Sequence, residues 1–504
     1  MIEGDKGLNI VFTGDSITHG PLHTKGYRSY TEHFRERLKE KFKNNIVKEN
    51  IIIFNTGVSG ATTRDIIRDF NICVDICDPD IVFIMLGMND SSNEIVPLEE
   101  YRKNILELIN KVRGIGAIPI LQTSNIIKMD LSRKSLKFYM DILREVARGN
   151  DVMLIDHYSH WEDLEKENSN IKNELLSDLI HPNEKGHLEI VKFIFKELDI
   201  FEEESYTCNL SYPIKAENYL QRKVDNKCNK EILNTISNKN PSQEELIKYT
   251  KENLNDNLEA ITNLINEDEK GIWVFLGDGY TNGTGDTFGY KNYVEYVEER
   301  IRWELNDGSI NKREKFMINF GTEKVNSEYL MNNFEDLVSK YNPKAVFIMI
   351  GGNEKINPEE FKHNLVNIVS KVKNINSIPI LQSPIKNGRD IEGYVKVIRE
   401  VSKEEEIFLI DNYEYWDRLS KVQKELIESW LVEGRANHRG HLEIAKKIFK
   451  DLRIYDHNSL ICGFTIEKLL IKIKLHQNWS SFDTAFYIQL IAFCNMKSSI
   501  YSSE

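Results

Sequence analysis

The feature that most constrains this chain is an internal repeat, because its two halves carry the same short blocks in the same order, about 255 to 264 residues apart. The run NIVFTGD at 9–15 returns as IWVFLGD at 272–278, and GYRSY at 26–30 returns as GYKNY at 289–293. The other pairs are 81–90 with 345–354, IPILQ at 118–122 with 378–382, 152–161 with 407–416, and GHLEI at 186–190 with 440–444. The order predicts one structural unit that has been duplicated.

Each unit alternates short apolar runs with longer amphipathic stretches. The runs IVFIML and IPILQ show no alternation of polar and apolar residues, which is typical of strands buried on both faces of a parallel sheet. Parallel strands need crossover connections, and the amphipathic stretches 30–42, 98–112 and 187–198 predict helices of that kind. The pattern therefore predicts the α/β class, with two three-layer α/β/α domains in tandem.

The length of 504 residues supports two domains, because it exceeds what one hydrophobic core usually serves. We expect a first domain at 1–200, a polar linker with helical segments at 201–268, and a second domain at 269–457. Residues 458–504 have no counterpart in the first unit, and their sequence does not indicate a structure.

Composition and charge argue against several classes of partner. The net charge of -13, with no Lys/Arg-rich run to reverse it locally, argues against nucleic acid. The six cysteines lack metal-site or disulfide-scaffold spacing, so we expect no metal and reduced thiols. With neither a signal-peptide pattern nor an apolar run long enough for a membrane anchor, the sequence predicts a cytoplasmic protein.

Candidate catalytic residues lie at the two ends of the first unit. Ser16 follows the apolar run 9–12, just past the carboxyl end of a predicted strand, where α/β folds place their ligand sites. Asp178 and His181 are three residues apart, so one turn directs both side chains to the same side and the carboxylate can orient the imidazole toward Ser16. Alternatively, Asp15 and Ser16 cap the following helix, and Asp178 and His181 are solvated helix-start residues.

Ester cleavage through Ser16 also needs hydrogen-bond donors for the developing oxyanion. Gly60, in NTGVSGATT, can expose a backbone N–H because glycine allows a close approach of the chain. Asn89, in LGMND at the end of another apolar run, offers a side-chain amide. Turn formation is the alternative role for both residue types.

Together the GDS block with Ser16, the Gly60 turn, the GMND block with Asn89 and the Asp178/His181 pair resemble the four blocks of the SGNH or GDSL hydrolase family over about residues 8 to 200. The resemblance implies a flavodoxin-like domain without cofactor. It further implies Ser16 as nucleophile, His181 as general base and Asp178 as its orienting carboxylate. The oxyanion hole would consist of the Ser16 and Gly60 N–H groups and the Asn89 amide.

The second unit has lost this set of residues. Ser16 corresponds to Gly279, Gly60 to Lys324, Asp178 to Val432 and His181 to Arg435, whereas Asn353 retains the position of Asn89. We therefore expect a degenerate copy that packs against the first unit. A retained ligand-binding role through Thr281, Asp286 and Arg435 is the alternative.

The functional expectation is a serine esterase acting on small acyl esters, with O-acetylated carbohydrates, lysophospholipids and thioesters as substrate classes that the family handles. His19, Tyr27 and Arg28 follow the nucleophile and are expected to line its pocket. The rival hypothesis is a non-catalytic binding or scaffold protein built from two such folds. The intact set of candidate residues in the first unit favours the enzyme.

Overall fold

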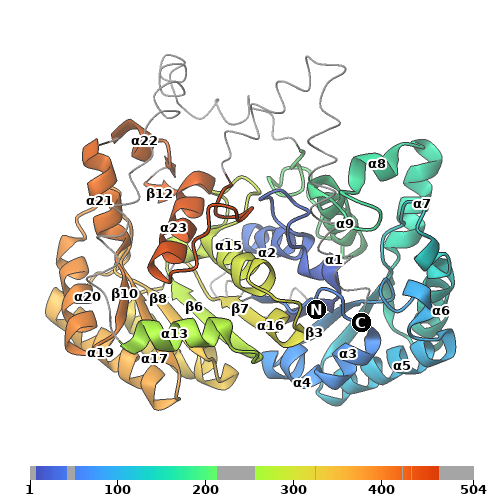
Figure 1. Ribbon diagram of the computed structural model, residues 1–504, viewed down its shortest axis with the longest axis horizontal. Coiled ribbons are helices and arrows are strands. Elements are labelled where there is room, and N and C mark those ends of the chain that lie inside the picture. Colours follow the sequence, from blue (N-terminus) through green and yellow to red (C-terminus); the bar gives the residue numbers. More distant parts are fainter. Residues whose placement is uncertain are drawn as a thin grey trace. The chain divides into compact units, whose positions relative to one another are not determined.

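The computed structural model describes residues 7–42, 51–212 and 256–464, apart from 324, 423 and 433. Within these ranges each half contains a five-stranded parallel sheet (Figure 1). The strands of the first half are β1 (Asn9–Gly14), β2 (Ile52–Asn55), β3 (Ile81–Met85), β4 (Ile118–Gln122) and β5 (Met153–Ile155). Those of the second are β6 (Gly271–Gly277), β7 (Lys315–Asn319), β8 (Ala345–Met349), β9 (Ile378–Gln382) and β10 (Phe408–Ile410).

The strand order β2-β1-β3-β4-β5 in the first half is that of a flavodoxin-like sheet. The second half has the equivalent order, β7-β6-β8-β9-β10. Every residue of β3 and of β8 is buried, as expected for central strands covered on both faces. Phe12 stacks on Phe83 at 4.4 Å between ring centroids, and the repeat-related Phe275 stacks on Phe347 at 4.3 Å. The predicted α/β class and its tandem arrangement are confirmed.

Helices of the first half flank its sheet (Figure 1), and α2, α5 and α9 confirm the three amphipathic helices predicted from the sequence. Short 3₁₀ turns lie at Asp75–Cys77, Ser92–Glu94 and Leu131–Arg133. The helices are α1 (Ser16–His19), α2 (Tyr30–Lys41), α3 (Thr63–Arg68), α4 (Phe70–Cys73), α5 (Leu98–Gly114), α6 (Leu136–Gly149), α7 (His157–Glu167), α8 (Ile171–Leu175) and α9 (Glu184–Glu197).

The second half repeats this layout with an added π-helical turn, η5 (Arg300–Glu304), after α15. A short antiparallel pair, β11 (Leu431–Val432) and β12 (Arg435–Ala436), precedes its last helix. The helices are α13 (Asp256–Asn266), α14 (Gly279–Asn282), α15 (Tyr293–Glu299), α16 (Ile310–Arg313), α17 (Ser327–Asn332), α18 (Phe334–Leu337), α19 (Pro358–Asn374), α20 (Glu392–Glu404), α21 (Asn412–Val422), α22 (Lys424–Glu428) and α23 (His438–Asp451), with a 3₁₀ turn at Ser339–Tyr341.

The predicted linker is only partly described. Its first residues pack on the first half, where Tyr212 contacts the ring of Tyr27 at 4.1 Å. Its last helix, α13, packs on the second half, because Lys315 donates to three carbonyls at the end of that helix. Residues 213–255 of the linker and 465–504 of the C-terminal extension lie outside the described residues, so the domain boundaries stay predictions.

The two halves, both within the compact unit of residues 1–462, contact each other through the repeated GYRSY and GYKNY segments. Tyr27 and Tyr290 form an antiparallel bridge, and their hydroxyls are 2.8 Å apart. The reciprocal hydrogen bonds run from Arg28 N to Gly289 O (2.9 Å) and from Lys291 N to Gly26 O (3.0 Å). Equivalent atoms of the two copies meet, which is the geometry of an isologous dimer interface within one chain.

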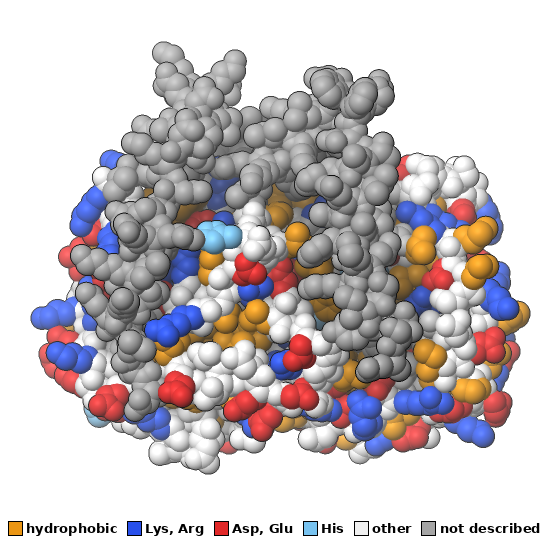
Figure 2. Space-filling model, in the orientation of Figure 1, with side chains coloured by type: hydrophobic (Ala, Val, Ile, Leu, Met, Phe, Trp, Pro, Cys, Tyr) orange, Lys and Arg blue, Asp and Glu red, His pale blue; other side chains and the backbone are white. Residues whose placement is uncertain are grey.

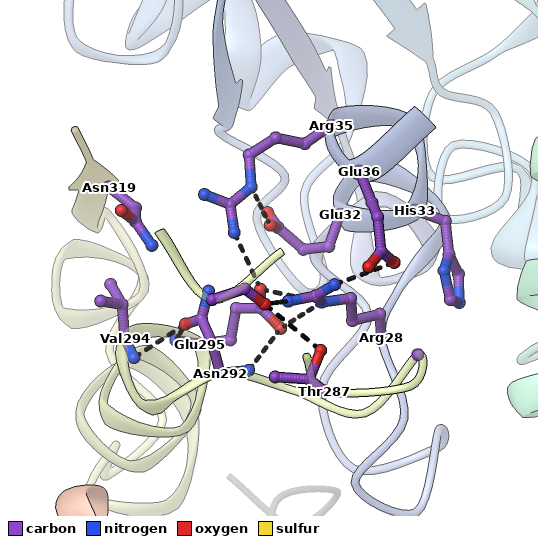
Figure 3. A network of polar contacts seen from close by, with 12 residues as sticks. Arg28, Glu32, His33, Arg35, Glu36, Thr287, Asn292, Val294, Glu295 and Asn319 are labelled. Carbon is purple, nitrogen blue, oxygen red and sulfur yellow. Dashed lines mark hydrogen bonds and ion pairs between the residues drawn. The ribbon is translucent and has the colours of Figure 1, made fainter. Parts of the chain in front are cut away.

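Buried charges surround this bridge. Figure 3 shows Arg28, which precedes α2, between Glu36 of α2 and Glu295 of the second half, with Arg35 also directed at Glu295. Tyr27 and Arg28 are 3% and 0% exposed. The expectation that these two residues line a substrate pocket is wrong, because both are used in the contact between the halves.

Figure 2 shows charged side chains of both signs mixed on the described part of the surface in one view of the molecule. No helix among the described residues has the length and apolarity needed to cross a membrane. The four cysteines in the described ranges, Cys73, Cys77, Cys208 and Cys462, are buried free thiols.

Candidate active site

Ser16 lies at the carboxyl end of β1, as the sequence predicts. Gly14 has no room for a side chain there, because a Cβ at this position would collide with the carbonyl oxygen of Met85 in β3. Asp15 caps α1 by accepting a hydrogen bond from Ile17 N (2.9 Å), which leaves Ser16 as the first residue of that helix. Burial raises the pKa of Asp15 to about 7, although the bond from Ile17 lowers it. The capping role therefore belongs to Asp15, and the Ser16 hydroxyl is available for other contacts.

The loop between α8 and α9 brings His181 to Ser16. The Ser16 Oγ to His181 Nε2 distance is 2.9 Å, and His181 Nδ1 lies 2.7 Å from Asp178 Oδ2. The other oxygen of Asp178 accepts from Ile180 N (2.8 Å) and from His181 N (2.7 Å), so the carboxylate folds the turn that carries the histidine. Three residues that are 165 and 3 positions apart in the sequence thus form one hydrogen-bonded chain.

The charge state of Asp178 determines which atoms donate and which accept in the hydrogen bonds that link Asp178, His181 and Ser16. Partial burial acts to raise the pKa of Asp178, but the hydrogen bonds and charge of His181, with two backbone N–H groups, outweigh it and hold that pKa well below the usual range. An ionised carboxylate only accepts hydrogen bonds, so His181 Nδ1 must be the donor. The unprotonated Nε2 then faces the Ser16 hydroxyl and can accept its proton.

The two candidate oxyanion residues lie on neighbouring loops. Gly60, in the turn after β2, has a φ of +87°, a conformation that favours glycine. Asn89 follows β3 and donates from Nδ2 to Ala61 O (3.0 Å), which fixes its amide beside the Gly60 turn. Thr63, two residues after Ala61, donates from its backbone N–H (3.0 Å) and its hydroxyl (2.6 Å) to Oδ1 of the buried Asp90. The carboxyl ends of β1, β2 and β3 thus each contribute one predicted residue.

Sequence reasoning missed His23. Its ring stacks on that of His181 at 4.1 Å with an interplanar angle of 11°, and its Nδ1 lies 2.8 Å from Ser177 Oγ. Burial lowers the pKa of His23 to about 3, so it is a neutral ring beside the His181 imidazole. No local pattern marks it, because it lies in an irregular loop.

One group of side chains here has the donor types of a metal site. Donor atoms of His23, Asp178 and His181 lie within 4.8 Å of one another. Two of these residues already form the 2.7 Å hydrogen bond that orients the histidine. A cation bound there would compete with that bond, so the donor set fits a hydrogen-bonded triad better than a resident metal.

The equivalent place in the second half is filled by an ion-pair cluster. Arg435 Nη1 donates to Glu323 Oε1 (2.8 Å), and its Nε pairs with Asp286 Oδ2 (3.2 Å). A Cβ on Gly279 would lie 2.8 Å from Glu323 Oε2, so the carboxylate takes the space of a serine side chain. Thr281 is buried with its hydroxyl 2.9 Å from Tyr293 Oη. The three residues considered for a retained ligand site thus make contacts within the protein.

Comparison with known proteins identifies a family for both halves of the chain. Residues 12–188 and 275–441, one range in each half, match the GDSL-like Lipase/Acylhydrolase family. The chain belongs to that family. This GDSL-like acylhydrolase is thus a carboxylic ester hydrolase by family, and the two matching ranges confirm the tandem duplication.

Relatives of this GDSL-like acylhydrolase correspond to a single half. It is 30% identical over 215 residues to the uncharacterized lipoprotein YqeF of Bacillus subtilis (strain 168), with 36% of this chain and 83% of that protein covered. It is 24% identical over 216 residues to an acetylxylan esterase of Geobacillus stearothermophilus, with 38% and 94% covered. Similar solved structures include LAE5, an α/β hydrolase enzyme from the metagenome of Lake Arreo, Spain (25% identity, TM-score 0.35, 40% and 100% covered), and the acetylxylan esterase Axe2 of Geobacillus stearothermophilus (24%, 0.35, 40% and 98%).

Proposed function

We propose that this GDSL-like acylhydrolase is a serine esterase that cleaves small acyl esters through Ser16, His181 and Asp178. The observation that carries the proposal is the unbroken chain from Ser16 Oγ to His181 Nε2 (2.9 Å) and from His181 Nδ1 to Asp178 Oδ2 (2.7 Å). Nucleophile, base and orienting carboxylate in that order are the parts that acyl transfer through serine requires.

In the acylation half-reaction Ser16 Oγ attacks the ester carbonyl carbon while its proton passes to His181 Nε2. The carbonyl oxygen becomes an oxyanion, which we assign to the N–H groups of Ser16 and Gly60 and to the Asn89 amide. The imidazolium formed at His181 is stabilised by the ionised Asp178. Collapse of the intermediate breaks the carbon–oxygen bond to the alcohol, which leaves with the proton from His181.

Deacylation repeats these steps with water. His181 takes a proton from water, whose oxygen attacks the acyl-enzyme carbonyl, and the same donors hold the second oxyanion. Collapse returns the proton to Ser16 Oγ and releases the carboxylic acid. The free enzyme is regenerated with no cofactor consumed.

Within the ester class we propose O-acetylated carbohydrates as the substrate, since the acetylxylan esterase among the relatives matches over 94% of its length. We assign catalysis to the first domain, predicted at 1–200, and regard the second domain, predicted at 269–457, as an inactive copy. Support for the inactive copy comes from the Arg435–Glu323 ion pair and from Gly279 in the nucleophile position. A cytoplasmic location remains part of this proposal.

The test uses the full chain with p-nitrophenyl acetate and acetylated xylo-oligosaccharides, alongside labelling by a fluorophosphonate. Turnover and labelling should occur in the wild type, vanish in Ser16→Ala, and persist in Ser169→Ala, which alters an exposed serine. Turnover of p-nitrophenyl acetate without release of acetate from the oligosaccharide would refute the carbohydrate assignment alone. A folded wild type that neither turns over nor labels would refute the esterase.

A further inference from the structure

Two arginines of the second half bind the loop that carries Gly60 in the first. Arg302, in η5, donates from Nη2 to Gly57 O (2.6 Å). Arg313, at the end of α16, donates from Nη1 to Ser59 O (2.5 Å). Arg302 Nε also donates to Arg313 O (2.8 Å), which ties the two contacts together. The oxyanion loop of one copy is thus anchored by the other copy.

Arg313 contacts the Ser59–Gly60 peptide group, which carries the N–H proposed as an oxyanion donor. The carbonyl of Ser59 and the N–H of Gly60 belong to the same planar trans peptide, in which C=O and N–H point in opposite directions. A guanidinium held on the carbonyl therefore fixes the direction of the Gly60 N–H. It also polarises the peptide, because hydrogen bonds linked in series strengthen one another.

Further contacts make the loop rigid around this peptide. The Gly57–Val58 peptide, two peptides earlier, is held at both ends, because Arg302 donates to Gly57 O while Val58 N donates to Gly14 O (2.9 Å). Ser59 Oγ lies 2.8 Å from His19 Nδ1, and the His19 ring makes a T-shaped contact with Trp303 from η5, with 6.3 Å between ring centroids.

We propose that the degenerate second half is an intramolecular positioning element for the oxyanion hole, with Arg313 and Arg302 as its positioning residues. The proposal rests on the esterase function proposed above. On this proposal the second half, which has lost its own catalytic residues, acts by holding the oxyanion loop of the first half. Oxyanion donors contribute to the rate only when they are held in place before the charge develops, so loosening the Ser59–Gly60 peptide should lower kcat.

The repeat supplies a matched control. Lys39 occupies the position in α2 that corresponds to Arg302, and its Nζ donates to Gly321 O (2.8 Å) and to Asn282 Oδ1 (2.6 Å). Gly321 corresponds to Gly57, so Lys39 of the first half anchors the equivalent loop of the second half. That loop borders the Glu323–Arg435 ion pair instead of a nucleophile. Both contacts stabilise the interface between the halves, but only one serves a catalytic loop.

The experiment compares Arg313→Met, Arg302→Met and Lys39→Met in the full chain. We expect kcat for p-nitrophenyl acetate to fall by about 10- to 100-fold in Arg313→Met with KM unchanged, a smaller loss than the outright removal of an oxyanion donor. Arg302→Met should show a weaker loss, and Arg313→Lys should recover part of the activity. Lys39→Met should lower Tm comparably and leave kcat unchanged. Amide hydrogen exchange of residues 57–61 should rise only in the two arginine variants.

Equal kcat in Arg313→Met and wild type would overturn the proposal. So would an equal kcat loss in Lys39→Met, because the effect would then reflect the stability of the interface. An inactive wild type would refute the esterase instead, and in that case exchange at 57–61 still decides whether the arginines hold the loop. Unchanged exchange there would overturn the positioning role independently of catalysis.

Discussion

The buried charge network between the halves makes a quantitative prediction for Arg28→Met. The Arg28 guanidinium is fully buried, with Nη1 2.9 Å from Glu36 Oε2 and Nε 3.2 Å from Glu295 Oε1. Its Nη2 also donates to Gly283 O (2.8 Å). Methionine retains much of the aliphatic stem, so the substitution mainly removes the charge and the donors.

Removal of one partner from a buried ion pair typically costs about 3–5 kcal/mol, because the remaining charge has lost its compensation. Here Glu36 loses this cation and Glu295 keeps its pair with Arg35 (3.2 Å), and we expect the free energy of unfolding to fall by an amount in that range at about pH 8. Burial raises the pKa of Glu295, and Arg28 is the foremost group that lowers it. Without Arg28 that pKa rises further above the unfolded value.

The sign of the pH dependence follows from this shift. A carboxyl whose folded pKa exceeds its unfolded pKa stabilises the fold below the unfolded value, and this stability is lost as pH rises through the folded value. Because the folded pKa of Glu295 is higher in the variant, the variant loses more stability than the wild type as pH rises from the unfolded pKa through the folded pKa. The difference in unfolding free energy between the two proteins should therefore be smaller at about pH 5 than at about pH 8.

The assay is equilibrium urea denaturation followed by tryptophan fluorescence at both pH values. The control is Arg64→Met, which breaks a two-pronged pair with Glu100 (2.5 and 2.7 Å) that is open to solvent. Exposed pairs contribute little, so this control should be close to wild type. If Arg28→Met is no more destabilising than Arg64→Met, burial is not what makes the network important. A destabilisation that is independent of pH would contradict the role assigned to Glu295.

Three further predictions concern the site. Asp178→Asn places an amide against the His181 imidazole, favours the wrong tautomer for the proposed general base and should lower kcat by about 10⁴-fold in ester hydrolysis assays; an activity near wild type would contradict the proposed triad. Asp15→Asn removes a carboxyl whose folded pKa is about 7 against an ordinary 3.8. Its stability relative to wild type, measured by denaturation across pH, should therefore rise by about 4 kcal/mol between about pH 4 and pH 7, and a flat difference would count against that pKa. Gly279→Ser in a Ser16→Ala background should create no fluorophosphonate labelling, because Glu323 fills that place; any labelling there would refute the blocked site.

Much of the fold was predictable because the signals that specify it are local or repeated. The continuous apolar runs 81–86 and 118–122 predict strands with two buried faces, and both form interior strands of the first sheet, β3 and β4. The candidate triad was accessible for a similar reason. Ser16 follows a strand, and Asp178 and His181 share one turn, so each position has a recognisable local context.

No local sequence pattern predicts the contacts between the halves. Nothing in the pattern around Arg302 or Arg313 indicates that they bind carbonyls about 245 and 254 residues away, as they do at Gly57 and Ser59. Arg28 was misassigned to a pocket for the same reason, since its partners Gly283 and Glu295 lie more than 250 residues away. His23 was missed because its stacking on His181 depends on how two irregular loops meet.

By itself the sequence determined the duplicated α/β units, the residues of the candidate triad and their loss from the second unit, because hydrophobic pattern, spacing and residue type express these directly. Only the tertiary structure decided the hydrogen-bonded geometry of Ser16, His181 and Asp178, the ion pair that fills the second site, and the hold of the second half on the Gly60 loop. Such contacts depend on three-dimensional packing of segments far apart in the chain, and short-range sequence pattern does not encode them.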